Sequence, residues 1–178
     1  MKFVALLRAI NVGGANPIEM KELKEAFESA GMRSVRTYIN SGNVIFESEL
    51  TDRVEMRAAL EAAIEARFGF PIRVLVLDAA EIRSVAAAIP AEWTNDGEMR
   101  CMVMYLWPEA DDRSILERLP KNPAIDSLIY TKGAVIHKVD RANQTRSRLT
   151  GLVGGPLYQQ LTSRNCNTAR KLVELMSK

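Results

Sequence analysis

The residues between Ser163 and Thr168 combine polar and basic side chains in a pattern that favours anion binding. A run with helical spacing follows them, so Asn167 or Thr168 is expected to cap a helix here. The free backbone N–H groups and the dipole at such an N-terminus attract a phosphate or a carboxylate. The side chains expected to grip that anion are Arg164, Asn165, Asn167, Thr168 and Lys171.

The alternative is that this segment is only the well-capped start of a terminal helix. In that case Asn165 and Asn167 bond to backbone groups, and Arg170 pairs with Glu174 along the helix. Nothing in the segment matches a diagnostic phosphate loop, so the sequence leaves both interpretations open.

The most basic segment of the chain lies a little earlier. It holds one acid, Asp140, against the cations Lys138, Arg141, Arg146 and Arg148. The uncharged polar residues among them suit a loop that holds an anionic ligand, with Arg148 as its contribution to the site. The alternative is that these charged side chains are simply solvated at the surface and bind no ligand.

Two glycine-containing loops form a third candidate, Asn11-Val12-Gly13-Gly14 and Asn40-Ser41-Gly42-Asn43. They are expected at the ends of adjacent strands, where they would line one edge of a sheet. Their polar side chains, with a neighbouring arginine, are Arg8, Asn11, Asn40, Ser41 and Asn43. The paired glycines lack the spacing of a dinucleotide or P-loop signature, and the sequence favours the alternative that both loops are ordinary turns.

Few side chains could carry catalysis. The single histidine, His137, is not placed by any motif beside a nucleophile and an acid, and we expect it half-buried in a strand. Cys166 would gain reactivity from the positive charge of Arg164 and from a helix end. Cys101 and Cys166 are the only cysteines, and two are too few for a zinc site or a disulfide framework. No metal or cofactor is expected, and enzymatic activity stays open.

Composition agrees with an ordinary globular protein, since 47% of residues are hydrophobic and 26% are charged. No apolar run is long enough to span a membrane, and the short run Phe3–Leu7 is expected to be a strand rather than a signal-peptide core. The few cysteines suit the reducing cytoplasm. A net charge of +2 does not favour a dedicated nucleic-acid binder, although a local basic patch is compatible with one.

The elements expected in the first half follow the order strand, helix, strand, strand, helix, strand. The first helix is expected to start at Asn16, Pro17 and Glu19, and the second is expected to be capped by Thr51. This order predicts a ferredoxin-like, split βαβ arrangement. The expected elements are a strand Phe3–Arg8, a helix ending at Gly31, a hairpin Val35–Ile39 with Asn43–Glu47, a helix ending near Gly69 and a strand Ile72–Leu77.

The second half repeats that order without a residue-level repeat. We expect an α+β protein of two ferredoxin-like halves, whose antiparallel sheets pack into one compact unit. The expected division is 1–79, a connection 80–99, and 100–178. The expected elements are a short helix Ala80–Ile89, a strand Cys101–Trp107, a helix Asp111–Leu119, a hairpin Ile125–Tyr130 with Ala134–Val139, and two further helical stretches.

Three segments together resemble the bacterial domain-of-unknown-function family 1697. They are Leu6–Gly14, Thr37–Val44 and Ser163–Leu172, so the resemblance spans the chain. It implies the same cytosolic α+β fold and carries no activity. The sequence departs from the family pattern at Ala9, where Gly is usual, at Ala15 and Pro17, where basic residues are common, and at Cys166, where an aromatic residue is common. These departures weaken an anion role for the first loop, and the one at Cys166 also argues against catalysis by that residue.

These observations favour a protein that binds a phosphate-bearing small molecule or nucleic acid. An interaction module that uses a free sheet face or an edge strand, and an enzyme that uses the same cleft, are the alternatives. RNA recognition would require exposed aromatic residues on the sheet, and the candidates Tyr38 and Phe46 are better explained as core. The oligomeric state, monomer or dimer, is not fixed by the sequence.

Overall fold

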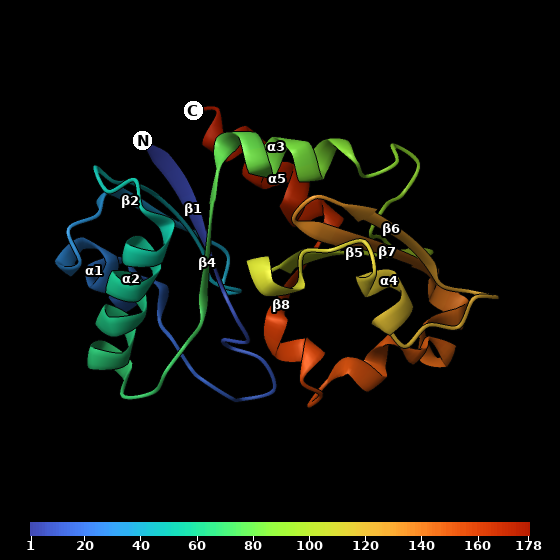
Figure 1. Cartoon of the computed structure of the whole chain (residues 1–178). Coiled ribbons are helices and arrows are strands. Elements are labelled where there is room, and N and C mark those ends of the chain that lie inside the picture. Colours follow the sequence, from blue (N-terminus) through green and yellow to red (C-terminus); the bar gives the residue numbers. More distant parts are fainter. The chain divides into compact units, whose positions relative to one another are not determined.

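The computed structural model describes residues 1–178 and divides into two compact units (Figure 1). Unit 1 comprises Met1–Ala79 with Leu175–Lys178, and unit 2 comprises Ala80–Glu174. Each unit contains a four-stranded antiparallel sheet, which confirms the α+β class. No helix combines the length and the apolar composition needed to cross a bilayer.

In unit 1 the strands follow the order β2-β3-β1-β4, and the predicted ferredoxin-like arrangement is confirmed. The helices α1 and α2 cover one face of this sheet, where Leu23 and Phe27 pack with Leu60 and Ile64. Phe46 joins the same core, as expected. The elements are β1 (Lys2–Leu7), α1 (Met20–Ser29), β2 (Arg33–Tyr38), β3 (Asn43–Glu47), α2 (Arg53–Phe68) and β4 (Val74–Asp78).

In unit 2 the strand order β6-β7-β5-β8 matches that of unit 1 strand for strand, so the predicted duplication of the fold is confirmed. The 3-10 helices η2, η3 and η4 stand where unit 1 has α2. The elements are α3 (Ala79–Ala87, starting at the boundary), β5 (Met99–Leu106), η1 (Pro108–Ala110), α4 (Ile115–Arg118), β6 (Ser127–Thr131), β7 (Ala134–Asp140), η2 (Arg141–Arg146), η3 (Arg148–Leu152), η4 (Leu157–Gln160), β8 (Leu161–Asn165) and α5 (Cys166–Met176).

The predicted helix starts in unit 1 are wrong by a few residues. Asn16 does not cap α1, because its side-chain amide donates to the Ala9 carbonyl oxygen at 3.1 Å, and the helix begins at Met20. The second helix is capped by Asp52 rather than Thr51. Its carboxylate accepts from two backbone N–H groups, those of Val54 at 2.7 Å and of Glu55 at 2.9 Å.

Two predictions for unit 2 are also wrong. The stretch Asp111–Leu119, expected as one helix, contains only the short α4, and the Asp111 carboxylate at its start instead accepts from Tyr130 Oη at 2.9 Å and from Gly133 N at 2.8 Å. Of the two further helical stretches, the last is α5, as expected, but the chain before it holds the 3-10 helices η2, η3 and η4 and a strand, β8, that was not predicted. The strand β8 was missed because its polar sequence, Leu161 to Asn165, lacks a clear alternation of apolar residues.

Candidate functional site

The loops after β1 and after β2 lie together at one end of the sheet in unit 1. The backbone of Leu7 donates to the Gly42 carbonyl oxygen at 2.9 Å, and Asn11 Nδ2 donates to the Asn40 carbonyl oxygen at 2.9 Å. Arg8 N donates to the Arg73 carbonyl oxygen at 3.0 Å, which adds the start of β4. We call this region the loop end; it consists of Arg8–Pro17, Ile39–Asn43 and Arg73.

Within the loop end, two of the predicted site residues hold the loops in shape. Asn11 Oδ1 accepts from Ile18 N at 2.8 Å while its Nδ2 bonds to backbone oxygens. Asn43 is fully buried and donates to the Tyr38 carbonyl oxygen and to Ser41 Oγ, both at 3.0 Å. Asn11 and Asn43 therefore position the loops, and the exposed Asn40 and half-buried Ser41 remain for contact with a ligand.

The backbone of these loops adopts an unfavourable conformation. Ala9, Asn11 and Ile39 have φ values of 52°, 53° and 51°. Asparagine tolerates this left-handed region, but a β-branched residue there is a genuine outlier. Each such residue costs about 1–3 kcal/mol and persists only where the surrounding structure imposes it, often at ligand sites. Ile39 is also 48% exposed, so burial of its side chain does not explain its conformation.

Positive charge is present at the same end. Arg8 directly follows β1, and Arg73 directly precedes β4, so the two residues lie side by side at the end of the β1–β4 pair. Both are half-buried. An acid of the neighbouring helix, Glu61, accepts from the backbone N–H of Val74 at 2.8 Å. Arg73, which directly precedes β4, was not predicted as a site residue, although an arginine within the otherwise apolar run Ile72–Leu77 was a usable signal.

Five of the predicted residues in unit 2 lie in the last two residues of β8 and the first turns of α5, namely Arg164, Asn165, Asn167, Thr168 and Lys171. Asn165 is the cap, since its Oδ1 accepts from Thr168 N at 2.9 Å, so the predicted caps Asn167 and Thr168 are wrong. Asn167 Nδ2 donates to the Asn95 carbonyl oxygen at 2.9 Å. Thr168 is buried. These side chains bond to backbone groups of unit 2.

The cations around this helix start are also engaged. Arg164 is 5% exposed, and its Nη1 donates to Thr162 Oγ1 at 3.0 Å and to the Ser163 carbonyl oxygen at 2.8 Å. Burial lowers the pKa of Arg164 to about 10, so the guanidinium still carries its charge at neutral pH. Lys171, not Arg170, pairs with Glu174, at 2.7 Å, which corrects the predicted pair.

Arg170 has a structural role. Its Nη2 donates to the carbonyl oxygens of Pro90 at 3.1 Å and of Trp93 at 2.9 Å, and so holds the segment between α3 and β5. In the basic segment, Arg141 Nε donates to the Asp96 carbonyl oxygen at 2.9 Å. Arg148 is exposed on η3.

A buried polar cluster that sequence analysis missed lies beneath the basic segment. His137 lies in β7, as predicted, but it is buried rather than half-buried, and its Nε2 donates to Asp126 Oδ1 at 2.8 Å. Asp126 Oδ2 also accepts from Asn122 N at 2.8 Å, and the carboxylate bonds to the Ser147 hydroxyl. Strand alternation was the available signal. Leu128 pairs with His137, and Asp126 lies two residues before Leu128, so Asp126 and His137 are on the same face of the sheet.

The cluster predicts that stability falls in mild acid. Burial lowers the pKa of His137, and the Asp126 carboxylate offsets this only in part. Below about pH 6.5, His137 therefore takes up a proton more readily in the unfolded chain than in the folded chain. The free energy of unfolding then decreases as the pH drops, by at most about 1.4 kcal/mol per pH unit. Urea titrations of wild type and His137→Gln between pH 7.5 and 5 measure this. The variant should show a flatter dependence, and equal slopes would contradict the assignment.

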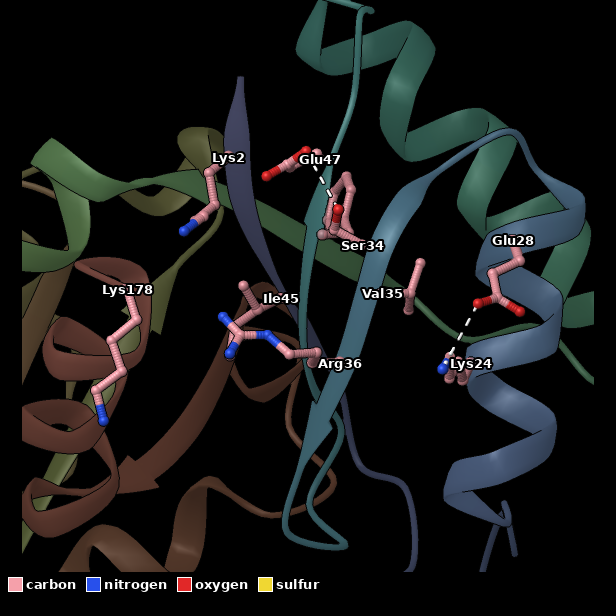
Figure 2. Close-up of a pocket in the computed structure, with 10 residues that line it drawn as sticks. Lys2, Lys24, Glu28, Ser34, Val35, Arg36, Ile45, Glu47 and Lys178 are labelled. Atoms are coloured by element: carbon pink, nitrogen blue, oxygen red, sulfur yellow. Dashed lines mark hydrogen bonds and ion pairs between the residues drawn. The ribbon is translucent and has the colours of Figure 1, made fainter.

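A separate hollow of about 370 Å³ lies around β2 in unit 1 (Figure 2). Figure 2 shows Lys24 and Glu28 on one side of β2 and Arg36 on the other, so the cations do not converge on one point. Lys24 pairs with Glu28 at 3.7 Å, and Lys2 lies opposite Glu47 in the sheet register. The hollow is therefore a weaker anion site than the loop end. Its charged lining residues are Lys2, Lys24, Glu28, Arg36, Glu47 and Lys178.

The comparisons with known proteins decide the family. Residues 1–137 match the model of a family described as a protein of unknown function (DUF1697). The chain belongs to this family. The resemblance seen in the sequence is thereby confirmed, and the match includes the whole loop end, while the basic segment and α5 lie beyond it.

One solved structure shares the fold along the whole chain. The conserved bacterial protein SP0830 from Streptococcus pneumoniae is 24% identical, each chain is covered to 98%, and the TM-score is 0.80. No curated protein matches the chain. This DUF1697 member thus shares the fold of a conserved bacterial protein, and its function has to be argued from its own residues.

Proposed function

We propose that the loop end of unit 1 binds a small molecule that carries a phosphate group. The observation that supports this most directly is Ile39, an exposed β-branched residue held at positive φ, next to the Asn40 carbonyl that Asn11 secures. Strain of this kind is retained where it preorganises a binding surface. Arg8 and Arg73 give that surface positive charge, and guanidinium groups bind phosphate oxygens through paired hydrogen bonds.

Each part of the loop end has a role in this proposal. Arg8 contacts the phosphate, and Asn40 and Ser41 donate hydrogen bonds from their side chains. The exposed Val12, at 62%, and Ile39 contact an apolar portion of the same ligand, as the base of a nucleotide would provide. The loop end offers no side chain that titrates near neutral pH, so binding is proposed here rather than acid–base catalysis.

A thermal-shift screen tests the proposal directly. The probes are inorganic pyrophosphate, nucleotides and phosphosugars, at low and high salt, with short RNA and DNA as a separate arm. A ligand at about a hundred times its dissociation constant should stabilise the protein by roughly 2.7 kcal/mol, a shift of about 5–11 °C. We expect Arg8→Ala to abolish the shift.

The matched control is Arg33→Ala. Arg33 lies at the opposite end of β2 and forms an exposed ion pair with Glu49 at 2.8 Å, so its loss should leave the shift intact. A shift that persists in Arg8→Ala would contradict the loop-end site. A shift lost in both variants would indicate unspecific binding of anions to positive charge.

The start of α5 and η3 remain a second anion-site hypothesis, formed by residues Arg148, Arg164, Asn165, Asn167, Thr168 and Lys171. Its specific support is the exposed guanidinium of Arg148, since most of the other polar groups already bond within unit 2. The same screen with Arg148→Ala separates the two sites. Stabilisation by oligonucleotides alone would favour nucleic acid over a small molecule as the ligand.

A further inference from the structure

The two cysteines of the chain face each other inside unit 2. Cys101 belongs to β5, and Cys166 follows directly after the last residue of β8. In the β5–β8 pair Val103 lies opposite Arg164, and the pair ends where Met102 lies opposite Asn165, so each cysteine is the next residue beyond the same end of the pair. Directly opposed residues of antiparallel strands have Cα atoms about 4.5–5.5 Å apart, and residues that adjoin such a pair can lie within the range of about 4.4–6.8 Å that a disulfide needs.

Their side chains also meet. Cys101 forms a hydrogen bond with the Cys166 thiol, and burial together with this neighbour raises the pKa of Cys101 to about 12. Both residues are free thiols and fully buried. We infer that Cys101 and Cys166 are an oxidation site of this protein, at which a peroxide closes a reversible intramolecular disulfide between β5 and the start of α5.

The surroundings assign a different role to each sulfur. Arg170 Nη1 lies 3.5 Å from Cys166 Sγ, and this sulfur lies at the first residue of α5, where backbone N–H groups point outward. Cys166 Sγ thus has a guanidinium beside it, as well as the Trp93 carbonyl and Asn167 Oδ1 that accept from its thiol, whereas Cys101 stays protonated at neutral pH. Cys166 is the sulfur that is oxidised first, and Cys101 resolves it.

The reaction balances with one molecule of hydrogen peroxide. The Cys166 sulfur attacks the peroxide, an S–O bond forms, the O–O bond breaks, and water leaves to give the sulfenic acid. Cys101 then attacks that sulfur, the S–S bond forms, the S–O bond breaks, and the proton of Cys101 leaves with the hydroxide as a second water. Two thiols are oxidised and one peroxide is reduced; a dithiol such as dithiothreitol reverses the step.

Access to the sulfurs depends on the segment that covers Cys166. The Trp93 carbonyl oxygen lies 3.8 Å from Cys166 Sγ, and residues 88–98 contain neither helix nor strand. This segment is held by Arg170 and by Asn167, and it can open locally without unfolding the sheet. We expect slow reaction of the native thiols, limited by that opening.

The test is oxidation of the folded wild-type protein with hydrogen peroxide, followed by thiol blocking in denaturant and intact mass measurement. The expected result is loss of both titratable thiols, a mass decrease of about 2 Da, and a crosslinked peptide pair that contains both cysteines. Dithiothreitol should restore both thiols. Closing so long a loop should also raise Tm by about 5–10 °C.

Cys101→Ala and Cys166→Ala serve as matched variants. Cys166→Ala should leave Cys101 unmodified by a peroxide dose that oxidises the wild type, whereas Cys101→Ala should stop at an oxidised Cys166. If either variant fails to fold, the peptide map of the wild type decides alone. Two thiols that survive peroxide in the folded protein, a sulfinic acid in place of the crosslink, or a disulfide formed only between chains would overturn the inference.

Discussion

Replacing Asp126 by alanine should lower the free energy of unfolding by about 2–5 kcal/mol, because it removes the acceptor of a buried hydrogen-bonded cluster. The Asp126 side chain has no exposed surface, and its carboxylate accepts bonds from His137 Nε2 and Asn122 N, both at 2.8 Å, as well as from Ser147. Two of those donors belong to the buried residues His137 and Ser147 and would lose their partner, and each such group costs about 1–3 kcal/mol.

The carboxylate form of Asp126 carries this stabilisation. Burial by itself would raise the pKa of Asp126, but the hydrogen bonds from Asn122, Ser147 and His137 outweigh it and hold the pKa below its ordinary value. A group with a depressed folded pKa contributes stability above its unfolded pKa, about 3.9, and that contribution is lost as the pH falls through the folded pKa. The full loss in Asp126→Ala should therefore be seen at neutral pH and shrink below about pH 4.

Equilibrium urea unfolding at pH 7 measures the effect, with two comparison variants. Asp126→Asn keeps an acceptor oxygen for His137 and should cost less than alanine. Asp140→Ala removes an exposed carboxylate that pairs with Lys138 at 2.9 Å, so its expected cost is below about 1 kcal/mol. Similar losses for Asp126→Ala and Asp140→Ala would show that the cluster does not stabilise the fold.

The elements of unit 1 could be predicted from the sequence because each is encoded locally. Leu23 and Phe27 recur at helical spacing, and the β2–β3 hairpin is marked by Ser41 and Gly42. The helix starts were misplaced because each has two adjacent or nearby residues able to cap, and the sequence does not show which of them bonds elsewhere. Asn16 looks like a cap in the sequence, yet the structure uses its amide to close the loop back to Ala9.

The candidate sites were less predictable, since long-range pairing decides what each side chain does. Arg164 was expected to face an anion, but β8, which the sequence did not reveal, places it in a buried setting beside Thr162. Asp126 and His137 are eleven residues apart and meet only through the register of the β6–β7 hairpin. In contrast, the adjacency of the loops at Asn11 and Asn40 followed from the expected topology and is confirmed.

Replacing Gly42 by alanine should cost about 2–5 kcal/mol of unfolding free energy through two additive causes. Gly42 has a φ of 76°, which disfavours any side chain, and an added Cβ would lie 2.8 Å from both Ile10 Cδ1 and Leu7 Cβ. Leu7 is fully buried and its backbone bonds to Gly42 O, so neither the loop nor β1 can move away cheaply.

Gly69→Ala separates these causes. Gly69 has nearly the same φ, 80°, at the C-terminus of α2, but nothing lies within 4 Å of its added Cβ, so only the conformational cost of about 1–2 kcal/mol applies. A thermal or urea denaturation of both variants should rank Gly42→Ala well below Gly69→Ala in stability. Equal losses would mean that the loop end yields to the methyl group. A pliable loop end could not impose the left-handed conformation of Ile39, so the same result would also remove the main support for a preorganised ligand site.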